Sequence, residues 1–279
     1  MNVEETLRQA LELGEEYRWE EMAKLLAEAL ETEAEEPYLL GWAGVAEREL
    51  GNDGLAYEYF RRCVAAEPLD PQLLSIAGAG LAAFDDPEAE PTLRAAALTG
   101  PDLSITHLHY GAYLAREGMF VEALEQLETA VALDADDPVI HGELGIAHAL
   151  KGNLAAAATS MERALELADD DSWTRLLLGL IQAEQKQTEE AAETLLRAAL
   201  ERPQDAEAQL LGALAAAAVG WDEAAQEVLA KAEYAEEGFQ PTVYHEVEER
   251  IALGAEAAET FLRDTIGASV LHERLTQPL

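Results

Sequence analysis

Apolar and polar residues follow one another along the chain with the period of an amphipathic helix. In the segment VEALEQLETAVAL, residues 121–133, most alanines, leucines and valines share one helical face, whereas the glutamates lie on the opposite face. The preceding segment, from Ser104 to Arg116, predicts a second helix, which ends at a short turn containing Gly118. The pattern therefore predicts pairs of antiparallel helices joined by tight turns.

Small residues recur along the chain at a fixed interval of 33 or 34 residues. One helix pair cannot bury its apolar face alone, so pairs that repeat at such an interval are expected to stack on one another. Small side chains allow neighbouring backbones to approach, and a larger apolar residue four positions after each alanine fills the gap between pairs. The glycines are Gly44, Gly78, Gly111, Gly145, Gly179 and Gly212; the alanines are Ala56, Ala89, Ala123, Ala157, Ala191 and Ala224; the larger residues are Phe60, Leu93, Leu127, Met161, Leu195 and Val228.

This pattern resembles the tetratricopeptide repeat family over nearly the whole chain. The best match runs from Leu144 to Leu167, where the Leu-Gly pair, the turn glycine Gly152 and the alanines Ala157 and Ala164 stand at the family's positions. The resemblance implies an all-α, right-handed superhelical solenoid of antiparallel helix pairs. It also implies that the first helix of each repeat lines a concave surface.

We expect a single repeat array over residues 1–279, with about seven repeats and a degenerate carboxy-terminal helix pair and cap. The ladders extend backward to Met22, Leu26 and Ala29, and forward to Ala257 and Phe261. The predicted repeats span residues 3–36, 37–70, 71–103, 104–137, 138–171, 172–204 and 205–237, and the last pair and cap span 238–279.

One repeat departs from the others at the segment FDDPEAEP, Phe84–Pro91, which carries two prolines. Pro87 is compatible with the first turn of a helix, whereas Pro91 would remove a hydrogen bond from a helix interior. We therefore expect the second helix of this repeat to begin late, near Glu90, after a longer loop.

The composition is strongly acidic, with 56 Asp and Glu against 18 Lys and Arg and a formal charge of −38. Such a charge argues against a nucleic-acid partner, because binding to phosphates requires Lys and Arg. Only four of the basic residues are Lys, a surface that suits a cytoplasm with high salt, where self-repulsion is screened. The alternative is an Ala- and Glu-rich helical protein from a genome with biased codon use.

Other features limit the class of protein. The single cysteine, Cys63, excludes an intramolecular disulfide framework and a CxxC site. The acidic amino terminus does not resemble a signal peptide. The longest uncharged run, Ala208–Trp221, is shorter than the ~20 residues of a membrane-spanning helix. We expect a cytoplasmic protein without membrane insertion.

The chain carries none of the common catalytic or phosphate-binding motifs, and we expect no enzyme activity and no cofactor. Its glycine-rich stretch Gly78–Ala83 lies inside a predicted helix and is explained by close helix packing. Three histidines, His107, His141 and His148, form the one candidate metal site, because two of them are 34 residues apart and the third lies two turns further along. The alternative is that each histidine is an ordinary packed or half-exposed helix residue.

The first helices of the middle repeats place apolar residues on the face that the resemblance assigns to the concave groove. We expect a non-catalytic scaffold that binds a partner peptide or amphipathic helix there. A basic partner is favoured by the acidic charge. The alternatives are a self-associating assembly protein, a groove covered by the chain's own end, and a metal-binding enzyme that uses the three histidines. The expected groove residues are Ile105, Leu108, Ala112, Val139, Ile146, Trp173, Leu176 and Leu180.

Overall fold

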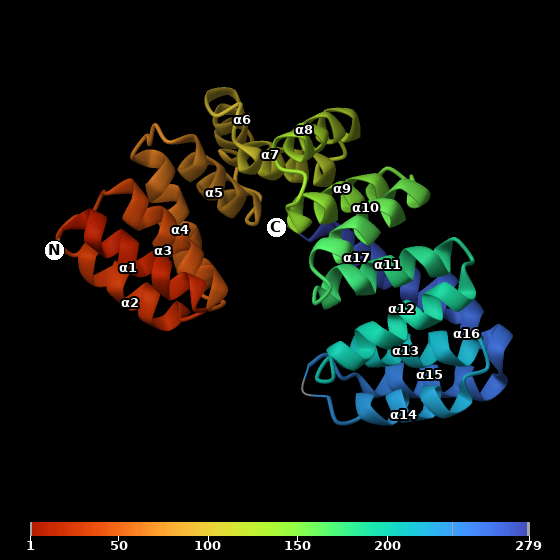
Figure 1. Ribbon diagram of the computed structural model, residues 1–279. Helices are drawn as coiled ribbons and strands as arrows, with labels where there is room; N and C mark the ends of the chain where they lie inside the picture. Colours follow the sequence, from red (N-terminus) through yellow and green to blue (C-terminus); the bar gives the residue numbers. More distant parts are fainter. Residues whose placement is uncertain (1, 236, 278–279) are drawn as a thin grey trace. The chain divides into compact units, whose positions relative to one another are not determined.

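The computed structural model describes residues 2–235 and 237–277, and their regular structure is helical throughout (Figure 1). The described residues contain no β-strand beyond an isolated bridge between Asp205 and Glu237. The chain divides into two compact units, which meet in sequence between residues 135 and 136. We call them unit 1 and unit 2 and describe each by itself. The continuity of a single array through this boundary stays a prediction.

Unit 1 consists of four helix pairs, and the two helices of each pair pack on one another. The first helices of successive pairs, α1, α3, α5 and α7, also pack side by side. Ser104–Arg116 and its partner are helices as predicted. The helices are α1 (Val3–Glu15), α2 (Trp19–Leu30), α3 (Pro37–Glu49), α4 (Asp53–Ala65), α5 (Pro71–Ala82), α6 (Ala89–Thr99), α7 (Ser104–Arg116) and α8 (Phe120–Leu133).

Unit 2 continues the same pattern through three pairs and then changes. The helices of these pairs are α9 (Pro138–Leu150), α10 (Leu154–Leu167), α11 (Ser172–Glu184), α12 (Thr188–Glu201), α13 (Ala206–Ala218) and α14 (Asp222–Ala232). The remaining elements are α15 (Pro241–Leu253), α16 (Ala255–Phe261), the π-helix η1 (Leu262–Ile266) and α17 (Gly267–Thr276).

The turn inside each of the first seven pairs holds one residue in the left-handed region. Glycine takes this position in four turns, with φ between +72° and +85°, which costs little because glycine has no Cβ. In the other three turns Tyr17, Asp85 and Lys186 adopt φ of +58°, +52° and +62°. These positions recur every 33 or 34 residues, so the turns repeat as regularly as the helices. The glycines are Gly51, Gly118, Gly152 and Gly220.

The recurring small residues allow close packing, as Phe60 illustrates. This side chain is fully buried in unit 1. A Cβ placed on Gly44 or Gly80 would lie 2.6 or 2.4 Å from atoms of its ring, closer than carbon atoms can approach. The ring therefore fills the space between two helices that only glycine leaves wide enough.

The repeat with two prolines begins its second helix late, as predicted. Helix α6 starts at Ala89 after a six-residue connection, whereas the other pairs up to α14 are joined by three residues. Pro91 falls in the first turn of α6, where a backbone N–H has no partner within the helix. The late start therefore avoids the loss of an internal hydrogen bond at Pro91.

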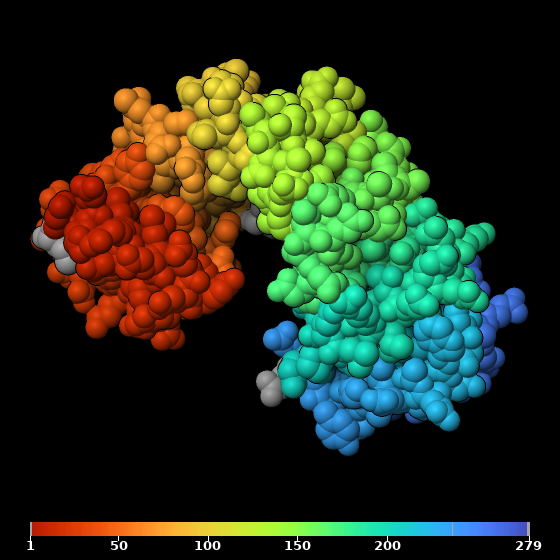
Figure 2. Space-filling model, viewed as in Figure 1, coloured from red at the N-terminus to blue at the C-terminus, as the bar shows by residue number. Residues whose placement is uncertain are grey.

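The carboxy-terminal elements do not extend the stack of pairs in the way of the preceding ones. After α15 the chain turns at Gly254, which has φ of +105°, and α16 packs on α13 as well as on α15. The segment then runs back, and α17 packs on α11 and α9 (Figure 1). From the same side, the helix pairs of unit 2 hide most of this segment in the space-filling view (Figure 2). Among the described residues, every helix falls short of the length and apolar character needed to cross a membrane.

Candidate protein-interaction site

The expected groove residues lie on first helices in both units, and we treat them as two separate surfaces. Face 1 is the part on α7 in unit 1, and face 2 is the part on α9 and α11 in unit 2. Face 1 comprises Ile105, Leu108 and Ala112, and face 2 comprises Val139, Ile146, Trp173, Leu176 and Leu180.

Face 1 is shallow. Ile105 is half-buried, and Leu108 and Ala112 are buried against the neighbouring helices. Helices α5, α6 and α8 pack on α7. The small residues on α5 allow α5 and α7, the first helices of successive pairs, to lie close together. The surface that face 1 offers to a partner is therefore formed mainly by Ile105.

A polar contact beneath face 1 links α5 to α7. The Ser75 hydroxyl donates to the Ile105 carbonyl oxygen at 3.2 Å and lies 2.9 Å from Nδ1 of His109. Burial lowers the pKa of His109 to about 4, because an imidazolium cation loses its hydration there. His109 is therefore neutral at physiological pH, and this half-buried side chain links α7 to α5 through Ser75.

Face 2 is partly open and partly covered. Val139 is 51% exposed and Ile146 is half-buried, whereas Leu176 and Leu180 are 0% and 2% exposed. The two leucines belong to a buried cluster that includes Val270, Leu271 and Leu275 of α17. The chain's own carboxy-terminal helix thus lies where a partner helix was expected. A groove covered by the chain's own end was one of the alternatives considered from the sequence.

Polar contacts also anchor α17 to face 2. Arg274 places its Cζ 4.6 Å from the centre of the Trp173 ring, and its Nη2 lies 2.8 Å from Oε1 of Glu207. The guanidinium of Arg202 lies against the same ring, also at 4.6 Å. A cation on the face of an indole ring is attracted by the negative π cloud. Face 2 therefore recognises an arginine as well as leucines.

The segment lies close to α11 at Gly267. A Cβ there would lie 3.2 Å from Cδ2 of Leu180 and 2.2 Å from the carbonyl oxygen of Leu262. A larger residue would push the helix away from α11 or disturb η1. Further along, Thr188 of α12 donates to Glu259 of α16 at 3.2 Å.

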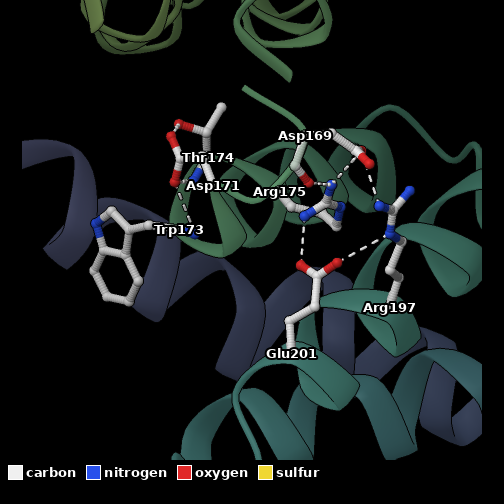
Figure 3. A network of polar contacts seen from close by, with 7 residues as sticks. All are labelled: Asp169, Asp171, Trp173, Thr174, Arg175, Arg197 and Glu201. Atoms are coloured by element: carbon white, nitrogen blue, oxygen red, sulfur yellow. Dashed lines mark hydrogen bonds and ion pairs between the residues drawn. The ribbon is translucent and has the colours of Figure 1, made fainter. Parts of the chain in front are cut away.

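A charged network fixes the start of α11, and with it the position of Trp173 (Figure 3). Arg175, which is 3% exposed, pairs with Glu201 of α12 and with Asp169 before α11, the latter at 3.0 Å. Arg197 contacts Asp169 at 2.8 Å and Glu201 at 3.0 Å. These hydrogen bonds raise the pKa of Arg197.

The first turn of α11 has a side-chain cap. Asp171 accepts hydrogen bonds from the backbone N–H groups of Trp173 and Thr174, both at 3.0 Å. Such a cap satisfies donors that lack a helical partner. The Trp173 ring points away from the network of Figure 3 and meets the C-terminal helix instead.

The histidines do not gather into a metal site in the part of the chain that the structure describes. No group of three or more His, Cys, Asp or Glu residues suited to a metal ion occurs there. In His107, Nδ1 lies 2.7 Å from Gln126 Oε1 and Nε2 lies 3.1 Å from the Pro101 carbonyl oxygen, so both nitrogens have protein partners. His141 and His148 lie on α9 of unit 2.

The contribution of Arg274 and Glu207 to face 2 was not anticipated from the sequence. One signal was available for the covering of α13: this helix carries a long uncharged run, and a helix that is apolar on all sides must be covered on all sides. In the structure every residue from Ala208 to Ala217 is buried, with α16 and α15 covering what α12 and α14 leave open.

Comparisons with known proteins agree with this architecture. The family model described as tetratricopeptide repeat matches residues 148–218. No curated protein sequence matches the chain. The helix pairs show the predicted fold class, an all-α solenoid of antiparallel helix pairs, and the match places tetratricopeptide repeats at residues 148–218. Tetratricopeptide repeats generally act as non-catalytic scaffolds for contacts between proteins.

Solved structures share the fold. A chain from the crystal structure of an APC/C hetero-tetramer has a TM-score of 0.70 and 18% identity, covering 90% of this chain and 49% of its own length. A structure of pilF from Pseudomonas aeruginosa has a TM-score of 0.60 and 18% identity, covering 76% and 96%. A thermophilic TPR protein of Thermus thermophilus has a TM-score of 0.51 and 27% identity, covering 62% and 94%.

Proposed function

We propose that this protein is an interaction scaffold, without catalysis of its own, that binds an amphipathic helix of a partner protein on the first helices of its repeats. One observation carries the proposal: in unit 2 that surface already holds an amphipathic helix, α17. The side chains that receive α17 are those that the repeat pattern assigns to the groove. A surface that binds one such helix has the shape and chemistry for another.

The partner helix is expected to be basic on one side. The chain has a formal charge of −38, which attracts a cationic partner and speeds association, with salt weakening the effect. Arg274 shows the local form of this attraction through its contacts with Trp173 and Glu207. We place the protein and its partner in the cytoplasm as part of the same proposal.

Exposed residues allow a test that spares the core. Ile105→Glu combined with Val139→Glu puts carboxylates on faces 1 and 2, and should remove partners captured from a native extract at matched salt. The matched control, Leu98→Glu combined with Val121→Glu, adds the same charge to second helices, at side chains that are 74% and 61% exposed. The bound proteins would be quantified by mass spectrometry and remeasured, once purified, by calorimetry.

If both double variants retain the same proteins as the wild type, the groove is not the binding surface and the proposal fails. The alternative, self-association, predicts a dimer or larger species in light scattering that the Val139→Glu substitution dissociates. A wild type that stays monomeric contradicts that alternative.

A further inference from the structure

The C-terminal segment is built so that two separate apolar stripes face unit 2. Ala258, Phe261 and Leu262 form the first stripe, and Val270 and Leu271 begin the second. In an uninterrupted α-helix, at about 100° per residue, Leu271 would lie on the side opposite Leu262. The two stripes could not then meet the same surface.

The π-helix η1 reduces this mismatch. A π turn accommodates one extra residue, so the helix after Leu262–Ile266 is rotated by about 100° relative to a continuous α-helix. The rotation brings Val270, Leu271 and Leu275 into the buried cluster of α11. Such turns are rare, and inside α-helices they occur frequently at functional sites.

The link from α15 to the C-terminal segment is short. Only Gly254 separates α15 from α16, and its φ of +105° is a conformation that glycine reaches without strain. The outer side of α17 is polar and exposed, with Ala268, Ser269, His272 and Glu273 on the surface. The helix thus resembles a bound peptide in its chemistry, apolar towards face 2 and hydrophilic towards water.

We propose, building on the proposed function, that α17 is a displaceable internal ligand of face 2. The partner helix that displaces it presents a pair of adjacent apolar residues followed, one turn later, by an arginine and a leucine. The apolar residues occupy the positions of Val270 and Leu271, and the arginine contacts Trp173 and Glu207 as Arg274 does. The partner helix and α17 therefore compete for face 2.

A labelled synthetic peptide with the sequence of residues 255–277 serves as the probe. It should bind the full chain carrying Leu271→Asp and Leu275→Asp at least tenfold more tightly than the wild type, in fluorescence anisotropy. These substitutions weaken the internal helix and leave face 2 intact. The matched control, Ala268→Asp with Ser269→Asp, adds the same charge to the exposed side of α17 and should behave as the wild type.

Two further measurements establish the site. The same peptide with Arg274→Glu should bind at least tenfold more weakly, and Trp173→Ala in the Leu271→Asp, Leu275→Asp chain should reduce binding to a similar extent. Circular dichroism should show that this chain loses no more helix than α17 itself contains.

The proposal is overturned if the peptide binds all chains equally, or binds none of them. It is also overturned if the Leu271→Asp, Leu275→Asp chain loses helix beyond α17, because the segment is then a structural part of unit 2. Dimers of the wild-type chain in light scattering would also overturn it, because the end of a second copy would then be the ligand of face 2. None of these outcomes affects the capture test with Ile105→Glu and Val139→Glu, which addresses the proposed function alone.

Discussion

Helices α7 and α11 occupy the same place in their repeats but have different surroundings. In α7, half-buried residues such as His109, Tyr110 and Tyr113 interrupt the buried ones. In α11, every residue from Thr174 to Ala183 is buried. Helices next to α7 in sequence account for its packing, whereas α11 is also covered by η1 and α17 from the far end of the chain.

The comparison shows that a position in the repeat does not by itself determine exposure. Leu108 of α7 is buried by close packing of neighbouring pairs, whereas Leu176 of α11 lies in a cluster completed by α17. A partner that binds face 1 needs no rearrangement, and a partner that binds the covered part of face 2 must first displace a helix.

The largest expected effect is on the core of unit 1. Phe60→Ala should lower its free energy of unfolding by about 4 kcal/mol, because a fully buried ring is removed. Cys63 in the same unit reports the change: its thiol is buried, and burial raises its pKa to about 12. Reaction with a thiol reagent in urea should therefore begin at lower denaturant than in the wild type.

The matched change in unit 2, Met161→Ala, also empties a fully buried site. It should shift the circular dichroism transition of unit 2 and leave the reaction of Cys63 unchanged. If both substitutions accelerate the reaction of Cys63 with the reagent equally, the two units unfold together. That result would contradict the division into two units.

A smaller loss is expected at the network that holds Trp173. Glu201→Leu leaves the buried Arg175 with Asp169 as its remaining carboxylate partner, which should destabilise unit 2 by about 3 kcal/mol in urea denaturation. Glu166→Leu breaks an ion pair between exposed side chains, Arg163 and Glu166, and should have no measurable effect. Similar losses from both changes would contradict the role given to burial.

Acid should weaken unit 1 through His109. Its pKa is about 4 in the folded chain and about 6.5 when unfolded, so the unfolded chain binds the additional proton between these values. Stability is thus unaffected above pH 6.5 and falls below it, by about 2 kcal/mol at pH 5. His109→Asn keeps a hydrogen-bonding group near Ser75. It should remove this part of the pH dependence of the stability of unit 1, measured by urea denaturation at a series of pH values. An unchanged profile would argue against a buried neutral imidazole.

The smallest effect is a gain in a turn of unit 2. Lys186 has φ of +62° at the position where other turns have glycine. Lys186→Gly should stabilise unit 2 by about 1 kcal/mol, because it removes the clash of a Cβ in the left-handed region. Lys186→Ala removes the same charge and keeps the Cβ, so thermal melting should show no comparable gain. A gain from Lys186→Ala would indicate a charge effect instead.

The sequence was sufficient for the elements that depend on neighbours one repeat away. The ladder from Gly44 to Gly212 predicted the helix pairs, and the prolines near Pro91 predicted the late start of α6. Both follow from local sterics and from a repeating hydrophobic period.

The reversal of the C-terminal segment could not be read in the same way. Extending the ladder to Ala257 and Phe261 predicted one more pair with Ala257 at the small-residue position. In the structure Ala258 is fully buried instead of Ala257, and its helix, α16, packs on α13 and α15. The π turn at η1 brings the stripes of α16 and α17 closer in direction, and a fixed helical period does not include such a turn. The repeat period predicts contacts between successive pairs. It does not predict a helix such as α17 that packs back on earlier pairs.

Hydrogen–deuterium exchange on the unchanged full chain tests the central claim, that face 2 is a helix-binding surface occupied by the chain's own end. With excess peptide of residues 255–277 that carries heavy isotopes, so that its fragments differ in mass from those of the chain, amides of residues 267–276 of the chain should exchange faster. Those of residues 172–184 should stay protected because α11 remains covered. Exchange of residues 267–276 that is as slow as that of α11, and unchanged by the peptide, would contradict the account.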